Sequence, residues 1–416
     1  MPSGRPEELA ENSTCPPKPP LPERFPRTIG PNAMRYLAEV VESGFSRTDT
    51  MVERFEGAFA LELGVKHCIA TPGCNPALQL LAVALQFEPG DEVIVSPITD
   101  YGSIAGLVKE NLIPVFADTA PDSVNFSAET IAECVTERTR AILVVHMTGL
   151  ICDMDPINRL AAEHRLVVYE DVCQAVFGQY KGRLAGTMAR AAAFSFDSEK
   201  TMGADLGGCL VTDDDQLAER ARFIGHQRGG VQQPGFGRAH LEAGYAFRMP
   251  QCTAATCLAQ LEIIREQVLQ RDKMVRYLSQ LIDEIPGVAS FTIPDYVEIY
   301  SAWMFSIRID RDQFTCTPDE FAKQMSAAGI AGAGIGKYYL MPLGAAFLNE
   351  HAEVGVYPFC TPPASRRYRY DETTCPRATA FVDNWIRWLS FSEKYTRQHC
   401  EIASQIVADV ARRNRS

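Results

Sequence analysis

Two strand-like runs of this chain are apolar and finish at side chains that can hold and activate a cofactor. The run Leu166–Asp171 closes on two carboxylates, Glu170 and Asp171. The run Ala193–Lys200 closes on a lysine and leads into a glycine-bearing loop. Carboxylates at the carboxyl end of a strand face the ligand crevice of an α/β sheet. From this segment alone, capping of a following helix explains the two carboxylates equally well.

A lysine and a buried carboxylate are together what pyridoxal phosphate (PLP) chemistry requires. The Lys200 amine can form a Schiff base with the aldehyde of PLP. Asp171 can keep the pyridine nitrogen protonated, which makes the ring an electron sink. An isolated loop lysine is usually a solvated surface charge, so the hypothesis depends on both segments. A third segment, Thr71–Ala77, opens a helix whose free N–H groups can hold a phosphate, although Pro-Gly is also ordinary loop punctuation.

The elements that must position these residues follow from the alternation of short apolar runs with helix-like stretches. Continuous apolar strands separated by helices are typical of a mostly parallel sheet that is covered on both faces. The sequence therefore predicts a large α/β domain with seven strands near His67–Ala70, Glu92–Val95, Pro114–Ala117, Ala141–His146, Leu166–Tyr169, Ala191–Phe196 and Gly208–Val211.

Three parts are expected along the chain. Residues 1–30 are rich in proline and charge and predict a mobile extension. Residues 31–265 are expected to form the large PLP-binding domain, and residues 266–416 a smaller α+β domain. The boundary falls inside a long helical pattern, Thr253–Ile285, which could bridge the two domains.

The chain resembles the DegT/DnrJ/EryC1/StrS sugar aminotransferases, a branch of the fold-type I PLP enzymes with the aspartate-aminotransferase fold. The matching motifs are Phe55–Ala60, Pro89–Ile94, Pro114–Asp118, Arg138–Ile142, His146–Gly149, Asp153–Ile157, Glu170–Ala175, Phe194–Phe196, Lys200, Gly207–Gly208 and Gly244–Met249. This resemblance implies that Lys200 forms the Schiff base and Asp171 pairs with the pyridinium. It also implies that Gln174 lies beside the ring oxygen and that Ser195 binds the cofactor phosphate.

The chain departs from the family pattern around the cofactor. The family's Ser-Gly-Thr phosphate turn falls on Gly73, Cys74 and Asn75, so two hydroxyls are missing and backbone N–H groups and the Asn75 amide remain. The aromatic residue that stacks on the ring aligns with Asp100, unless Tyr101 takes its place after a small backbone shift. The asparagine that reaches the phosphate from a partner subunit aligns with Ala246, so we expect that contact to be absent.

The resemblance implies a transaminase that moves an amino group from glutamate or glutamine to a keto sugar, a sugar nucleotide or a cyclitol, in amino sugar or antibiotic biosynthesis. It also implies a homodimer with shared active sites. One alternative is PLP-dependent elimination, dehydration or aldol-type cleavage from the same carbanion. A second is a non-catalytic PLP-fold regulatory protein. Trp303, Tyr338 and Tyr339 could contact substrate, although aromatic core packing is the commoner role.

Composition excludes several other classes of protein. The formal net charge of −12 leaves no broad basic face, which speaks against nucleic acid and anionic membrane surfaces as partners. Thirteen cysteines are scattered without a CxxC pair, so we predict no disulfide framework and no metal site. No apolar run is long enough to span a membrane, and Met1 to Arg27 lack the core of a signal peptide. We therefore expect a soluble, cytoplasmic protein.

Overall fold

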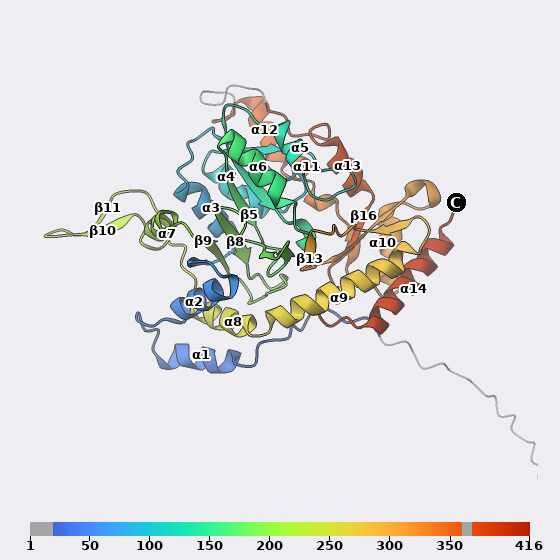
Figure 1. The fold of residues 1–416 in the computed structure, drawn as a ribbon, viewed down its shortest axis with the longest axis horizontal. Coiled ribbons are helices and arrows are strands. Elements are labelled where there is room, and N and C mark those ends of the chain that lie inside the picture. Colours follow the sequence, from blue (N-terminus) through green and yellow to red (C-terminus); the bar gives the residue numbers. More distant parts are fainter. Residues whose placement is uncertain (1–19, 360–367) are drawn as a thin grey trace, which may run out of the picture.

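A seven-stranded sheet lies at the centre of the computed structural model, which describes residues 20–359 and 368–416 (Figure 1). Its strand order is β1-β9-β8-β5-β4-β2-β3. The strands from β8 to β3 run parallel, whereas β9 runs antiparallel to both of its neighbours. The seven predicted strands are confirmed, as β1 (His67–Thr71), β2 (Glu92–Val95), β3 (Ile113–Phe116), β4 (Thr139–Val145), β5 (Val167–Asp171), β8 (Ala191–Ser195) and β9 (Gly208–Thr212).

Helices bury the apolar strands of this sheet. Helix α2 (Met51–Leu63) packs against β1 and α8 (Gln251–Leu261), and α3 (Cys74–Ala84) packs against β8, β9 and α4 (Tyr101–Lys109). Local sequence fixes their ends. For example, Thr50 and Glu53 form a capping box before α2, and Gly64 ends the helix in the left-handed region at φ 76°. The other helices of this part are α1 (Ala33–Glu42), α5 (Ala128–Ala132), α6 (Met154–His164) and α7 (Asp215–Ala221).

The carboxyl ends of β4, β5 and β8 meet at one edge of the sheet. Val145 at the end of β4 pairs with Asp171 at the end of β5, and Asp171 pairs with Ala193 of β8. Ser195 in turn pairs with Gly208, the first residue of β9. The register therefore brings Asp171, Ser195 and the loop that carries Lys200 to the same edge.

The C-terminal part is α+β. The predicted continuous helical pattern is interrupted at Glu262 and Ile263, between α8 and α9 (Ile264–Asp283). Helix α9 packs against α14 (Arg397–Arg413) and leads to an antiparallel sheet of order β12-β14-β16-β15 (Figure 1). The strands of this sheet and the helices around it are β12 (Val288–Ser290), β14 (Phe305–Ile309), α10 (Pro318–Ala327), β15 (Ala333–Ile335), α11 (Met341–Gly344), α12 (Ala346–Val354), α13 (Pro376–Asp383) and β16 (Trp385–Trp388).

Two small sheets complete the described chain. One joins β13 (Val297–Ile299), β6 (Gln179–Tyr180) and β7 (Arg183–Leu184). The other is a hairpin of β10 (Gly230–Gln233) and β11 (Gly237–His240), which projects from the body (Figure 1). Among the described residues, no helix combines the length and the apolar character that a membrane span requires.

The N-terminal segment departs from the mobile extension predicted over residues 1–30. Residues 1–19 lie outside the described residues. Residues 20–30, however, pack against the body, and Arg24 is 6% exposed. Its guanidinium donates hydrogen bonds to main-chain carbonyls far along the chain. Composition alone misses this because a proline-rich, charged stretch is also typical of unpacked chain.

Candidate active site

A cavity of about 760 Å³ opens at the carboxyl ends of β4, β5 and β8. All of the predicted site residues line it, namely Gly73, Cys74, Asn75, Tyr101, Asp171, Gln174, Ser195 and Lys200. These side chains come from segments up to about a third of the chain apart. Their convergence follows from the sheet order, because β5 and β8 are adjacent and α3 begins beside the start of β9.

Both carboxylate oxygens of Asp171 accept hydrogen bonds. Its Oδ1 accepts a hydrogen bond from the Cys173 main-chain N–H at 3.0 Å, and its Oδ2 accepts one from the Ser103 hydroxyl at 2.6 Å. Ser103 also contacts the Thr99 hydroxyl at 2.6 Å. Two donors keep the carboxylate in one orientation. The sequence reasoning missed Ser103, because nothing in the local pattern of α4 distinguishes it from an ordinary buried helix serine.

Glu170 has a structural role. Its side chain is fully buried and accepts hydrogen bonds from the main-chain N–H groups of Gly186 and Met188, each at 2.9 Å. Its Oε2 also lies 2.9 Å from Nε2 of His146, which is fully buried and also lines the cavity. Glu170 and Asp171 are consecutive strand residues and point to opposite faces. Neither of them caps a helix, because turns follow β5.

Lys200 lies in the cavity against an aromatic side chain. Its Nζ is 4.3 Å from the centroid of the Trp303 ring, within the range of a cation–π contact. The indole N–H of Trp303 donates to the Glu199 carbonyl at 2.7 Å. Trp303 therefore contacts both the side chain of Lys200 and the main chain next to it. Core packing, the commoner role of such a residue, does not describe these contacts fully.

The start of α3 forms a tight turn with anion-binding character. Gly73 is the N-cap residue, and Cys74 and Asn75 begin the helix, whose first N–H groups have no partner within the helix. Such a terminus carries partial positive charge and binds phosphate well. A Cβ at Gly208 would lie 2.4 Å from the Gly73 carbonyl carbon, so only glycine lets β9 pass this turn. Main-chain donors at one end of the cavity, with Asp171 and Lys200 in the same cavity, fit the phosphate, ring nitrogen and aldehyde of PLP.

Two thiol groups lie beside Asp171 in the cavity. The sulfur atoms of Cys74 and Cys173 and a carboxylate oxygen of Asp171 lie within 4.8 Å of one another. Burial raises the pKa of both thiols above the usual range. The predicted absence of a metal site stays a prediction.

Asp100, Tyr101, Tyr338 and Tyr339 also line the cavity. Asp100 caps α4 by accepting from the Gly102 N–H at 2.8 Å, and its other oxygen accepts from the Tyr338 hydroxyl at 3.1 Å. Tyr101 packs edge-on against Phe347, with ring centroids 5.9 Å apart. Ala246 lies outside this cavity, in a separate hollow beside α2.

Arg387 on β16 also lines the cavity and was not predicted as a site residue. Its guanidinium lies 5.7 Å from the centroid of the Tyr339 ring. Its buried Nε has no hydrogen-bond partner among the described residues. The sequence context Trp385-Ile-Arg-Trp388 is a strand pattern with a single charge, which is compatible with an ordinary solvent-facing arginine.

Comparison with known proteins gives consistent matches. The sequence model of the DegT/DnrJ/EryC1/StrS aminotransferase family matches residues 27–353. The chain is 34% identical to GDP-perosamine synthase of Caulobacter vibrioides over 306 residues, which cover 73% of this chain and 81% of that protein. The fold is that of 3-amino-5-hydroxybenzoic acid synthase, with a TM-score of 0.82, 24% identity and coverage of 95% and 99% of the two chains. It is also similar to DesI, solved in the presence of its TDP-sugar product, with a TM-score of 0.77, 25% identity and coverage of 95% and 93%.

Proposed function

The chain belongs to the DegT/DnrJ/EryC1/StrS aminotransferase family, and we propose that it transfers an amino group from glutamate or glutamine to a nucleoside-diphosphate keto sugar. Membership makes it a PLP-dependent sugar aminotransferase. The observation that carries the finer proposal is the single cavity shared by Lys200, Asp171, Arg387 and the start of α3. The nucleotide is supported by two similar proteins, one named for a GDP-linked sugar and one solved with a TDP-linked sugar.

The roles of the cavity residues follow from their chemistry. When bound, PLP supplies an electron-withdrawing ring that stabilises negative charge on the carbon next to the donor nitrogen. Asp171 would hold the protonated ring nitrogen, and Gln174 would lie beside the ring oxygen. The phosphate would be held by hydroxyl, amide and main-chain donors of Gly73, Cys74, Asn75 and Ser195. Tyr101 is the aromatic candidate for the ring face.

Lys200 would hold the cofactor covalently and then serve as general acid and base. When it is not bonded to the cofactor, the Lys200 amine would be able to take a proton from the donor's α-carbon and to return one in the reverse direction. The Trp303 ring beneath it limits where the amine can go. The hydrogen bonds from the Cys173 N–H and the Ser103 hydroxyl would hold the Asp171 carboxylate in one orientation toward the ring nitrogen in both halves of the reaction.

Arg387 is suited to bind the carboxylate of the amino donor. Glutamate and glutamine share an α-carboxylate, and a guanidinium binds a carboxylate with two parallel hydrogen bonds. The buried Nε of Arg387 has no hydrogen-bond partner among the described residues, so the guanidinium is not held by a protein acceptor through that atom. The aromatic contact with Tyr339 holds the guanidinium in place.

The experiment that tests the function is an absorbance titration of the purified protein with L-glutamate and L-glutamine, beside Lys200→Ala. We expect the cofactor band of the wild type to shift with the donor, and the variant to lack the band. Keto sugars linked to a nucleoside diphosphate, free keto sugars and keto cyclitols are then supplied in turn. The class with the highest kcat/KM identifies the acceptor. Equal amounts of 2-oxo acid and aminated product indicate transamination. A product without new nitrogen would indicate elimination or dehydration instead.

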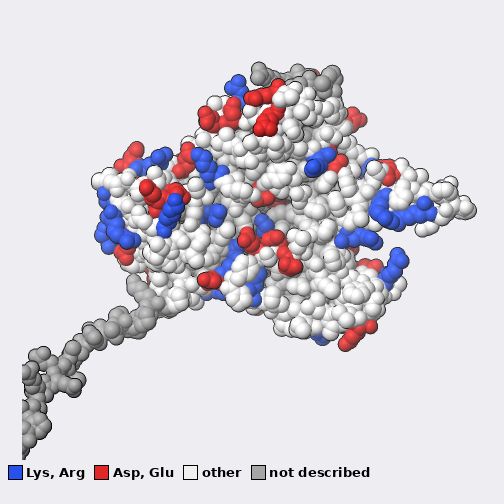
Figure 2. All heavy atoms as spheres, turned by 180° about the vertical axis from the view of Figure 1, so that it is seen from behind, with Lys and Arg blue, Asp and Glu red and all other residues white. Residues whose placement is uncertain are grey.

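We also propose a homodimer. Large apolar side chains stand exposed on α1, beside the cavity and on the hairpin, as shown by Met34, Phe45, Leu206, Phe236 and Leu241. The hairpin extends from the body with an uncharged tip (Figure 2). These side chains would leave water if their surfaces met a second copy of the chain. Sedimentation at several protein concentrations should give twice the mass of one chain, and a monomer would contradict the proposal.

A further inference from the structure

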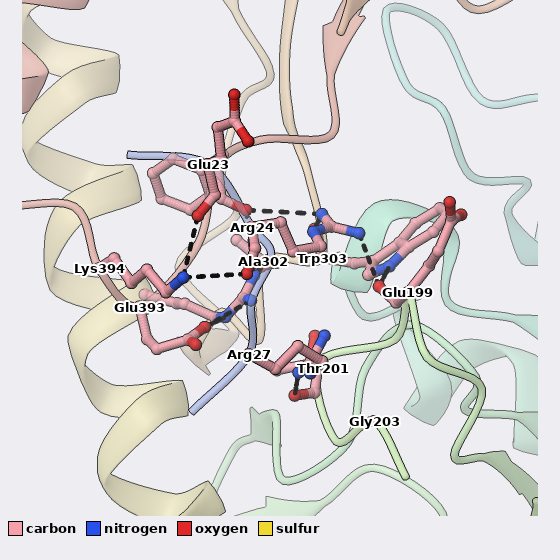
Figure 3. Close-up of polar contacts among 12 residues, drawn as sticks. Glu23, Arg24, Arg27, Glu199, Thr201, Gly203, Ala302, Trp303, Glu393 and Lys394 are labelled. Carbon is pink, nitrogen blue, oxygen red and sulfur yellow. Dashed lines mark hydrogen bonds and ion pairs between the residues drawn. The ribbon is translucent and has the colours of Figure 1, made fainter. Parts of the chain in front are cut away.

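Residues 20–30, here called the strap, run beside the loop that carries Lys200. In Figure 3 the side chains of Arg24 and Arg27 reach from the strap to this loop. Arg27 donates to the Ser198 carbonyl at 3.0 Å and to the Thr201 carbonyl at 2.6 Å. Arg24 donates to the Glu199 carbonyl at 2.6 Å. The two guanidinium groups therefore hold the main chain on both sides of Lys200.

A second set of contacts ties the strap to the Lys200 side chain through Trp303. The Arg24 guanidinium donates to the Trp303 carbonyl at 2.7 Å. Trp303 in turn donates from its indole to Glu199 and places its ring against the Lys200 Nζ. One buried arginine thus fixes both the loop and the ring on which the amine rests.

The end of the strap is joined to the same loop through an amide. The Gly30 N–H donates to Gln260 Oε1 at 2.8 Å, and Gln260 Nε2 donates to the Gly203 carbonyl at 3.0 Å. Gln260 is 1% exposed, so water does not compete for these bonds. The Arg27 side chain also lies so close to Gly203 that a Cβ there would be 2.9 Å from Arg27 Nε.

Anchoring of the strap to the body is provided by a different residue. Lys394 donates from Nζ to the carbonyls of Glu23, Arg24 and Pro26 at 3.1, 3.2 and 2.5 Å (Figure 3). The two arginines are therefore not needed merely to attach the strap. Burial, together with the charges of Arg271 and Arg27, lowers the pKa of Arg24 to about 9, so its guanidinium is still charged at neutral pH. A buried charge is stable only with good acceptors, and here these acceptors belong chiefly to the loop and Trp303.

We propose that Arg24 and Arg27 are positioning residues for Lys200, which hold its loop in the conformation that allows covalent attachment of PLP. This inference rests on the proposed role of Lys200. Attachment joins the Lys200 nitrogen to the aldehyde carbon and releases the aldehyde oxygen as water. A loop without its carbonyl partners spends more time in other conformations, and the equilibrium for attachment falls by the fraction of competent loop.

The test compares Arg27→Gln and Arg24→Lys with the wild type and with Arg265→Gln. Arg265 is a matched control because it lies on α9 and pairs with Glu62, away from the loop. Apoprotein is titrated with PLP and reduced with borohydride, and the labelled Lys200 peptide is quantified. Hydrogen exchange of residues 196–205 is measured on the same apoproteins. We expect about tenfold weaker attachment and faster exchange of this loop in Arg27→Gln, because each charged hydrogen bond contributes appreciably, and no change in Arg265→Gln.

The outcomes separate this inference from the proposed function. If the wild type is labelled at another residue or not at all, the role of Lys200 is wrong, and the exchange data still report whether the strap holds the loop. Unchanged loop exchange in Arg27→Gln would overturn the inference. So would faster exchange with native attachment, since the strap would then serve only stability. Arg27 is half-buried, so its variant remains informative if Arg24→Lys fails to fold.

Discussion

At the scale of single residues, the cavity depends on which face of a strand each side chain occupies. Glu170 and Asp171 are chemically alike and adjacent, yet one is enclosed by main-chain donors and the other lines the cavity. The alternation of a strand is sufficient to separate them. The same reasoning applies to Arg387, which lines the cavity although its neighbours on β16, Ile386 and Trp388, are fully buried.

Replacement of Arg387 by Gln should raise KM for the amino donor by roughly tenfold to a hundredfold, because a charged hydrogen bond to the carboxylate is lost. The kcat at saturating donor should change much less. Steady-state kinetics with L-glutamate and L-glutamine measure both quantities. If only KM for the sugar acceptor rises, Arg387 binds the acceptor and not the donor.

The alkylation rate of the two thiols in the cavity should depend on pH in a particular way. Because burial raises the pKa of Cys74 and Cys173, the reactive thiolate is scarce at neutral pH and increases only in alkaline solution. Alkylation of these residues in the apoprotein by iodoacetamide should therefore keep accelerating above the pH at which free cysteine levels off. Mass spectrometry of the two peptides across pH 7 to 10 measures this. A plateau below about pH 8 would show an activated thiol and contradict the assignment.

At the scale of elements, the shape of the turn at Gly73–Asn75 depends on the contact between the start of α3 and the start of β9. Gly208 touches the main chain of Gly73 and Cys74, so the turn at the start of α3 and the strand next to β8 are fixed relative to each other. This contact explains how a turn without the family hydroxyls still has a defined shape. The start of α3 supplies main-chain N–H donors, and β9 packs against the turn at Gly208.

Gly208→Ala should displace the turn, since the new Cβ would lie 2.4 Å from the Gly73 carbonyl carbon and 2.5 Å from the Cys74 nitrogen. We expect a loss of about 1–3 kcal/mol in the free energy of unfolding and weaker PLP binding. Gly57→Ala in α2 is the control, because its Cβ would meet no atom within 4 Å and should stabilise the helix by about 0.5–1 kcal/mol. Urea unfolding and PLP titration of both variants make the comparison. Equal stability of the two variants would mean that the turn relaxes freely.

At the scale of the whole molecule, a buried ion pair near the strap joins the long helix α9 to the segment that follows β16. Arg271 of α9 is fully buried and pairs with Glu393 at 2.7 Å, and its guanidinium also donates to the Ala302 carbonyl at 3.0 Å. Glu393 follows β16, so this pair connects the long helix to the C-terminal sheet. Burial alone would raise the pKa of Glu393, but Arg271 and a main-chain hydrogen bond outweigh it and hold the pKa below the usual value.

A lowered pKa in the folded state means that the pair stabilises the protein above the unfolded-state pKa of about 4.3. This stabilisation is lost as pH falls through the lower folded-state pKa. Glu393→Gln should cost up to about 3–5 kcal/mol at pH 7, because Arg271 stays buried without its charge partner, and should flatten the acid dependence. Thermal unfolding from pH 3 to pH 7 measures both effects. Asp319→Asn, in an exposed pair with Lys323, should change stability by under about 1 kcal/mol.

The sequence by itself determined the central sheet and the residues that lie at its edge. Apolar runs predicted all seven strands, since a strand buried on both faces needs an almost continuous apolar pattern. Asp171 was predicted because it ends such a run, and Lys200 because it lies in the loop just past another, where an α/β fold places both at the crevice. Their roles, like those of the other site residues, remain proposals.

Only the tertiary structure decided which distant residues complete the cavity and which support the loop of Lys200. Ser103 meets Asp171 across 68 positions of sequence, and Arg24 meets Glu199 across 175. Locally, Ser103 looks like a buried helix residue, Arg387 like a solvent-facing strand residue, and Arg24 like part of an unpacked tail. A hydrogen bond between remote segments leaves no periodic pattern in either of them, so its partners become known only when the chain has been folded around the sheet.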